Sequence, residues 1–254
     1  MNEGSEALTC RLKKLYTAFN QAFQAAEEQD CEIDTQLCSE AIEETRSLCT
    51  DPLTNKPETL ALLSYMLLKT SKIPAILGVI GKKRELKYQD RSLWDKALIE
   101  EGLEHLNKSA EGNTVSVYHL KAAVSACHSL AKDSKSTDWK HIVSLYDRYL
   151  SFNNSVEIAL ERAEVISSYK GARAEIKAIE EIIGNYTLNS KHHLYEKLGN
   201  LHSRLHEYKD ALKYFEIASR QAQSKTDKSK FKKKIQYCKM RLDYKKKYTL
   251  ELSF

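Results

Sequence analysis

Apolar residues recur every three or four positions along almost the whole chain. Near the start, Leu8, Leu12, Leu15, Phe19 and Phe23 fall on one helical face, which predicts an amphipathic helix. The same spacing of apolar residues continues to the other end of the chain, interrupted by short polar stretches. This pattern predicts about eleven helices, over 5–27, 33–49, from Pro57 to before Pro74, 92–108, 115–131, 138–151, 155–169, 172–184, 191–205, 208–223 and 228–246.

The scarcity of glycine and proline supports an all-α fold. The 254 residues include 8 Gly and 3 Pro. A β-sandwich or barrel needs a turn signal every 8–12 residues, and an α/β fold needs glycine-bearing loops. Because helices joined by short links pack beside their neighbours, we expect antiparallel helix pairs.

One helix and the segment after it differ from the rest. The helix that Pro57 opens contains the run ALLSYMLLK, which is apolar nearly all round and indicates a buried helix. No run reaches about 18 apolar residues and the first residues show no secretory leader, so we expect no membrane span and a cytoplasmic protein. Residues 71–91 form the least regular segment, with a short extended or helical piece expected around Ile76–Ile80.

The C-terminal part repeats a helix–turn–helix unit. The helix pair expected over 191–205 and 208–223 is similar to the tetratricopeptide (TPR) pattern. The small residues Gly199 and Ala211 would let the two helices approach closely. Phe215 and Ala218 would pack on the next unit, whereas Gln223 stands where the pattern usually has Pro. The residues at the characteristic positions are Tyr195, Leu198, Gly199, Ala211, Phe215 and Ala218.

The repeat suggests a division of the chain into two parts. We expect an N-terminal helical part over 1–110, which contains the irregular segment 71–91. Residues 111–254 would form TPR-like repeats in a right-handed solenoid, closed by a basic capping helix over 228–246.

Positive charge is concentrated in that last helix. The net charge is +5, and residues 225–247 hold eleven Lys and Arg against two acidic residues. Phe231, Ile235, Cys238 and Leu242 share one face of the helix. The helix is therefore either the solvated cap of the array or a patch that binds the phosphates of a nucleic acid.

Sequence motifs for catalysis and metal binding are missing. The chain has no HExxH, GxSxG or P-loop motif, and its six cysteines form no CxxC pair, which suggests free thiols. His202 and His206 lie four residues apart on one helical face, but no third ligand is evident. We expect no catalytic residues, no metal and no cofactor, and hence no enzyme.

Three blocks carry side chains of the kind that bind partners. They are residues 89–95, residues 118–123 with His128 beyond, and residues 137–139, and they contain both tryptophans. Trp and Arg would anchor a partner, and Asp would pair with them or with a partner's cations. The candidate interaction or interdomain residues are Asp90, Arg91, Trp94, Asp95, Tyr118, Lys121, His128, Asp138 and Trp139.

The same blocks also have a structural interpretation. Ser92 would cap the next helix, with Asp95 three residues on as in a capping box. Thr137 or Asp138 would cap the helix that follows. The two tryptophans would then be core anchors. In the functional interpretation, the blocks line a groove for a peptide or a small ligand.

The order of these blocks resembles one known family. PETLALLSYMLL, QDRSLWDKALIEEGL, VYHLKAAVSACHS, TDWKHIVSLYD and the TPR-like end follow one another as in the C-terminal extension of certain extracytoplasmic-function RNA polymerase sigma factors. The resemblance covers about residues 10–235. The chain departs from the family at the stretch Lys69–Lys72, at Lys121 and at Glu161–Ala163.

The resemblance implies a regulatory role. In that family the extension is thought to regulate the sigma factor from within its chain, and members are often found beside small YCII-like proteins. Its partners would be the core regions of the sigma factor or the core polymerase. The promoter-reading regions are absent, so we expect no promoter recognition by this chain alone. Two alternatives stay open: a free-standing TPR-like adaptor for a peptide, and a small-molecule sensor or enzyme with a site near the Trp, Asp and Arg residues.

Overall fold

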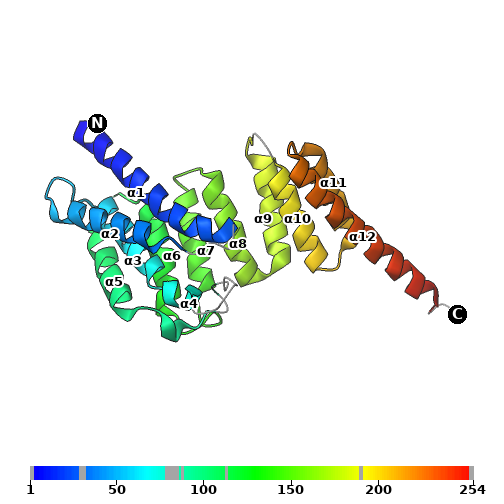
Figure 1. The fold of residues 1–254 in the computed structure, drawn as a ribbon, viewed down its shortest axis with the longest axis horizontal. Coiled ribbons are helices and arrows are strands. Elements are labelled where there is room, and N and C mark those ends of the chain that lie inside the picture. The colour runs from blue at the N-terminus through cyan, green and yellow to red at the C-terminus, as the bar shows by residue number, and fades with distance from the viewer. Residues whose placement is uncertain are drawn as a thin grey trace. The chain divides into compact units, whose positions relative to one another are not determined.

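The computed structural model describes residues 3–28, 33–77, 86, 89–111, 114–188 and 191–251. All regular secondary structure in these residues is helical, which confirms the all-α prediction (Figure 1). The contacts divide the chain into two compact units, Met1–Tyr149 and Leu150–Phe254. The expected boundary at residue 110 differs from this division, because α6 packs on α3 and so lies in the first unit.

The helices follow the apolar rhythm of the sequence closely. Eleven α-helices of 12 to 27 residues, together with the five-residue α4, occur in the described parts of the chain. The first unit holds α1 (Glu3–Glu28), α2 (Thr35–Thr50), α3 (Pro57–Thr70), α4 (Ile73–Leu77), the 3₁₀ turn η2 (Arg91–Leu93), α5 (Lys96–Ser109), α6 (Val117–Leu130) and α7 (Trp139–Leu150). The second unit holds α8 (Val156–Lys170), α9 (Ala172–Asn185), α10 (His192–Arg204), α11 (Tyr208–Gln221) and α12 (Lys225–Glu251).

Helix α3 is the centre of the first unit. Every residue from Ala61 to Leu68 is buried, and the helix packs against α1, α2, α5 and α6. Gly102 lets α5 approach α3 closely, because a Cβ there would lie 2.8 Å from Cγ of Leu68. By length and composition Pro57–Leu77 could cross a membrane, but 67% of its apolar window is buried inside the protein, as in a core helix.

The irregular segment is only partly described. Helix α3 ends before Pro74 as expected, and α4 provides the short helical piece. Residues 78–85 and 87–88 lie outside the described part of the chain. Cys31 does too, and the other five cysteines are free thiols as predicted.

In the second unit, helices adjacent in sequence pack together: α8 with α9, α10 with α11, and α11 with α12. A Cβ on Gly199 would lie 2.5 Å from Cε1 of Phe215, so this glycine sets the spacing of α10 and α11. Phe215 also packs against Cys238 of α12, and Ala218 packs against Phe231. The predicted packing roles are confirmed, and the right-handed TPR-like path remains a prediction.

Helix α12 buries the face that its sequence pattern predicts. Phe231 and Cys238 are fully buried, and Ile235 and Leu242 pack beside them. Lys230 and Lys234 both pair with Glu196 of α10, which fixes the helix on its neighbours.

Candidate functional site

The three blocks meet at the guanidinium of Arg91, which lies in η2. Its Nη1 donates to the carbonyl oxygens of His128 and Ala131, at 2.6 and 2.7 Å. Its Nη2 donates to Oγ1 of Thr137 at 3.1 Å. These carbonyls belong to the C-terminal end of α6, where a cation is favoured by the helix dipole and free carbonyls need donors. Arg91 therefore ties the end of α6 and the loop before α7 to the η2 turn.

The ring of Trp94 packs against the guanidinium of Arg91. Trp94 is 4% exposed, and its ring centroid lies 4.9 Å from Cζ of Arg91 and 5.2 Å from Nζ of Lys72. Both contacts are cation–π interactions. The ring of His128, 7% exposed, meets the ring of Trp139 edge-on at 5.3 Å. We call Lys72, Arg91, Trp94, His128 and Trp139 the Trp94 cluster.

Two polar atoms of the Trp94 cluster are buried without a hydrogen-bond partner among the described residues. They are Nε1 of Trp94 and Nδ1 of His128. The indole of Trp139, in contrast, donates to the carbonyl oxygen of Ser134 at 2.9 Å. Buried polar atoms are nearly always paired in folded proteins, so these two need an explanation.

The electrostatics of the Trp94 cluster are dominated by positive charge. Burial, together with Arg91 and Lys69, lowers the pKa of Lys72 to about 7. Burial, together with Lys72 and Arg91, lowers the pKa of His128 to about 3, so this imidazole is neutral at physiological pH. The pKa of Arg91 is also lowered by burial, with the exposed Asp133 opposing the shift.

The three candidate aspartates are helix and turn caps. Asp90 accepts from the main-chain N–H and the hydroxyl of Ser92. Asp95 accepts from the N–H of Leu98 and caps α5, and Asp138 accepts from the N–H of His141 and caps α7 as expected. The prediction that Ser92 caps the following helix is wrong. The helix begins at Lys96 because the carboxylate of Asp95 takes the capping position.

Two candidates lie apart from the Trp94 cluster. Tyr118 is at the first turn of α6, about 15 Å along the helix from His128, and its ring contacts that of Tyr16 at 5.5 Å. Burial raises the pKa of its hydroxyl. Lys121 is half-buried, one turn further along the same helix.

The structure adds Lys72 and Thr137 to the sequence-based site. Thr137 was considered only as a helix cap, and Lys72 only as a departure from the family pattern. A lysine two residues after the end of a buried apolar helix was the available signal, but its burial depends on Trp94, 22 positions away.

A serine and a histidine in contact do not indicate catalysis here. Oγ of Ser116 lies 2.8 Å from Nδ1 of His119, and the same nitrogen receives the N–H of Ser116. This is a capping box at the start of α6. The other nitrogen of the ring lies 3.3 Å from the carbonyl oxygen of Ser109. Both polar ends of the histidine therefore have a structural role.

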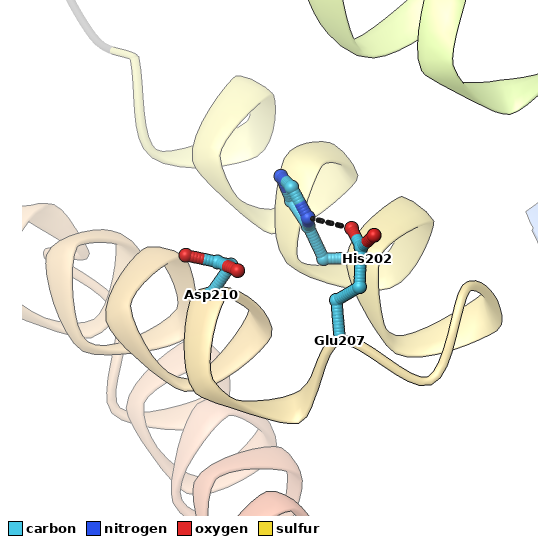
Figure 2. Close-up of side chains that lie close together, drawn as sticks. All are labelled: His202, Glu207 and Asp210. Carbon is cyan, nitrogen blue, oxygen red and sulfur yellow. Dashed lines mark hydrogen bonds and ion pairs between the residues drawn. The ribbon is translucent and has the colours of Figure 1, made fainter.

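A second group of possible ligands occurs in the second unit. His202, Glu207 and Asp210 place one donor atom each within 4.8 Å of one another (Figure 2). Nδ1 of His202 lies 2.8 Å from Oε2 of Glu207, and Arg173 pairs with the same carboxylate. These contacts lower the pKa of Glu207, with the hydrogen bond from His202 as the largest cause.

This group corrects the expectation that His202 lacks further ligands nearby, but the neighbours are carboxylates, not His206. His206 adopts a positive φ of 60° in the turn and its Nδ1 contacts the hydroxyl of Tyr208. Because Glu207 is already engaged by the hydrogen bond with His202 and the ion pair with Arg173, these contacts fix the turn between α10 and α11.

A pocket of about 320 Å³ opens in the first unit, between α2, α3, α4 and α5. Of the candidate residues, Asp95 is among those that line it. Arg46 in its wall is paired with Glu43 and Glu101.

Two comparisons with known proteins give matches. Residues 8–110 match a family of unknown function (DUF6596). The chain is also 29% identical over 178 residues to an uncharacterized protein of Rhizobium meliloti (strain 1021). The match covers 70% of this chain and 42% of that relative, so the chain spans less than half of the relative's length.

Proposed function

We propose that this chain is a non-catalytic regulatory domain that works by protein contact, as the C-terminal extension of an extracytoplasmic-function sigma factor does. Its partner would be the polymerase-binding regions of a sigma factor, or the core polymerase. The carrying observation is that three of the blocks resembling that extension meet at Arg91 in the first unit. This contact between separate blocks supports the proposal that they act together as one module.

The roles of the polar candidates favour contact over chemistry. The aspartates cap helices, and the Ser116–His119 pair is a capping box. In the described residues, these side chains are therefore occupied by structural hydrogen bonds. A regulatory domain needs a stable scaffold and an exposed surface, and both are present.

The outer face of α12 supplies a surface suited to a protein partner. Tyr237, Met240 and Tyr244 are 45%, 58% and 56% exposed, and their spacing of three and four residues places them on one stripe. Lys232, Lys233 and Lys239 of the same helix are also exposed. Aromatic and methionine side chains are typical interface anchors, and helices commonly insert such stripes into a partner's groove.

The direct test is a binding measurement with purified components. The chain is labelled at the exposed thiol of Cys10, and its fluorescence anisotropy is followed as the sigma core-binding regions, or core polymerase, are added. We expect saturable binding. The triple substitution Tyr237→Ser, Met240→Ser and Tyr244→Ser should weaken it at least tenfold, which is about 1.4 kcal/mol.

The matched control is Leu130→Ser, which removes an apolar side chain that is 71% exposed on α6. It should leave binding unchanged. If neither the sigma regions nor core polymerase binds the wild-type chain, the proposal is wrong. A peptide ligand bound without either of them would favour the free-standing adaptor.

A further inference from the structure

The ammonium of Lys72 is buried without an acidic partner in the described part of the chain. The side chain is 8% exposed and rests on the ring of Trp94. The ion pairs found among the described residues join neither Lys72 nor Arg91 to a carboxylate. Buried cations are normally paired, because desolvation otherwise disfavours the charged form.

The unsatisfied atoms around Lys72 are mostly hydrogen-bond donors. The indole N–H of Trp94 is donor-only, and it is buried without a described partner. The ammonium of Lys72 is also donor-only. Nδ1 of His128, likewise buried and unpartnered, donates or accepts according to its tautomer. Arg91 adds positive charge, although its guanidinium already donates to His128, Ala131 and Thr137.

We propose that the Trp94 cluster binds an oxyanion, a carboxylate or phosphate-type group, through the ammonium of Lys72 and the indole N–H of Trp94. Donor-only groups require an acceptor, and net positive charge requires an anion. Arg91 lies in η2 and Trp94 directly follows it, next to the exposed Ser92 and Leu93, so the chain around the site borders on solvent. The inference rests on the first unit alone and is independent of the sigma-factor proposal.

The two tryptophans make this site directly observable. Trp94 and Trp139 are the only tryptophans in the sequence, and both belong to the Trp94 cluster. In the full-length Trp139→Phe variant, Trp94 is the sole tryptophan reporter. Its emission is recorded while sodium sulfate replaces sodium chloride at constant ionic strength. Sulfate is the first probe because its charge does not change in the pH range used.

We expect a saturable change in the emission of Trp94 at millimolar sulfate. The nearly isosteric Lys72→Met should weaken the apparent affinity at least tenfold. The control Lys69→Met removes a neighbouring cation whose ammonium sits over Phe23 at 4.2 Å, and it should weaken the affinity no more than about twofold. Parallel titrations with acetate and inorganic phosphate then distinguish a carboxylate from a tetrahedral oxyanion.

The affinity should also depend on pH. Lys69, Arg91 and His128 face Lys72 in the described residues, from α3, η2 and α6. Arg91 stays charged and His128 stays neutral above pH 6, with a pKa of about 3. With the pKa of Lys72 at about 7, sulfate should bind roughly 30-fold more weakly at pH 8.5 than at pH 6.

Several results would overturn the proposal. These are a Trp94 emission that does not respond to sulfate, acetate or phosphate, a response equal in wild type and Lys72→Met, or an affinity that is independent of pH. In those cases water and a neutral Lys72 satisfy the site. Far-UV circular dichroism of each variant establishes that the fold is retained, and failure here leaves the sigma-factor binding test unaffected.

Discussion

The guanidinium of Arg91 hydrogen-bonds the carbonyl oxygen of His128 at 2.6 Å, across 37 positions of sequence. The contact places the positive charge of Arg91, from the block 89–95, at the C-terminal end of α6. It also explains why Arg and Trp are close neighbours in the sequence: the cation rests on the indole while its donors reach the carbonyls.

Arg91→Ala should destabilise the first unit by about 2 kcal/mol, because buried carbonyls at the end of α6 lose their donors. Arg91→Lys should recover only part of the loss, since an ammonium cannot reproduce the planar fork. The measurement is urea unfolding followed by tryptophan fluorescence, which reports only on this unit. Arg11→Ala is the control, because its pair with Glu44 is exposed and is worth less than about 1 kcal/mol. Equal losses in the two variants would contradict the assignment.

Asp95→Ala should lower the free energy of unfolding by about 1 kcal/mol, because the N–H of Leu98 loses its cap. Ser92→Ala should change it by less than about 0.5 kcal/mol, because the exposed serine is not the cap. The same unfolding experiment compares the two. The reverse order of effects would show that the helix begins at Ser92 in solution.

Gly199→Ala should destabilise the second unit by about 2 kcal/mol, because the new methyl group meets the ring of Phe215. Gly184→Ala adds the same group where nothing lies within 4 Å, and it should be neutral or stabilising by up to about 1 kcal/mol. Unfolding is followed by far-UV circular dichroism. Phe215→Leu in the Gly199→Ala background should restore part of the loss, and a Gly199→Ala protein as stable as Gly184→Ala would refute the packing role.

Stability should rise with pH between about 7 and 10 because of Lys72. Its pKa is about 7 in the folded chain and about 10.4 when unfolded. In this window the unfolded chain therefore binds more protons, which gives a slope of up to about 1.4 kcal/mol per pH unit. Below pH 7 Lys72 is charged in both the folded and the unfolded chain, so the full cost of burying the charge lowers stability there. Lys72→Met should abolish this slope when urea unfolding is measured at a series of pH values. An unchanged slope would show that a group other than Lys72 causes the pH dependence.

Much of the fold could be predicted from local sequence, because helices follow apolar periodicity. The buried face of α12 and the close approach of two helices at Gly199 were evident from spacing and side-chain size, although the contact of Gly199 with Phe215 was not. Both depend on contacts between neighbouring helices. The start of α5 was misplaced because both Ser92 and Asp95 are good capping residues, and only the η2 turn decides between them.

The candidate site was predicted less completely, since its contacts are long-range. The sequence identified Arg91, Trp94, His128 and Trp139, but not Lys72. A lysine is usually solvated, and only the tertiary fold shows that this one lies on a buried indole. Likewise, the proximity of Glu207 to His202 depends on the turn that contains His206, which the helical spacing of the two histidines does not reveal.

The most direct test of the regulatory role is transcription in vitro. A sigma factor of the extracytoplasmic-function type that lacks its own extension is assembled with core polymerase, and this chain is added in trans. We expect the amount of run-off transcript to change with the concentration of this chain. The Leu130→Ser variant should produce the same change, and the triple serine variant of α12 should produce none. The regulatory role would be contradicted if the amount of transcript stays unchanged at concentrations that saturate binding in the fluorescence anisotropy measurement.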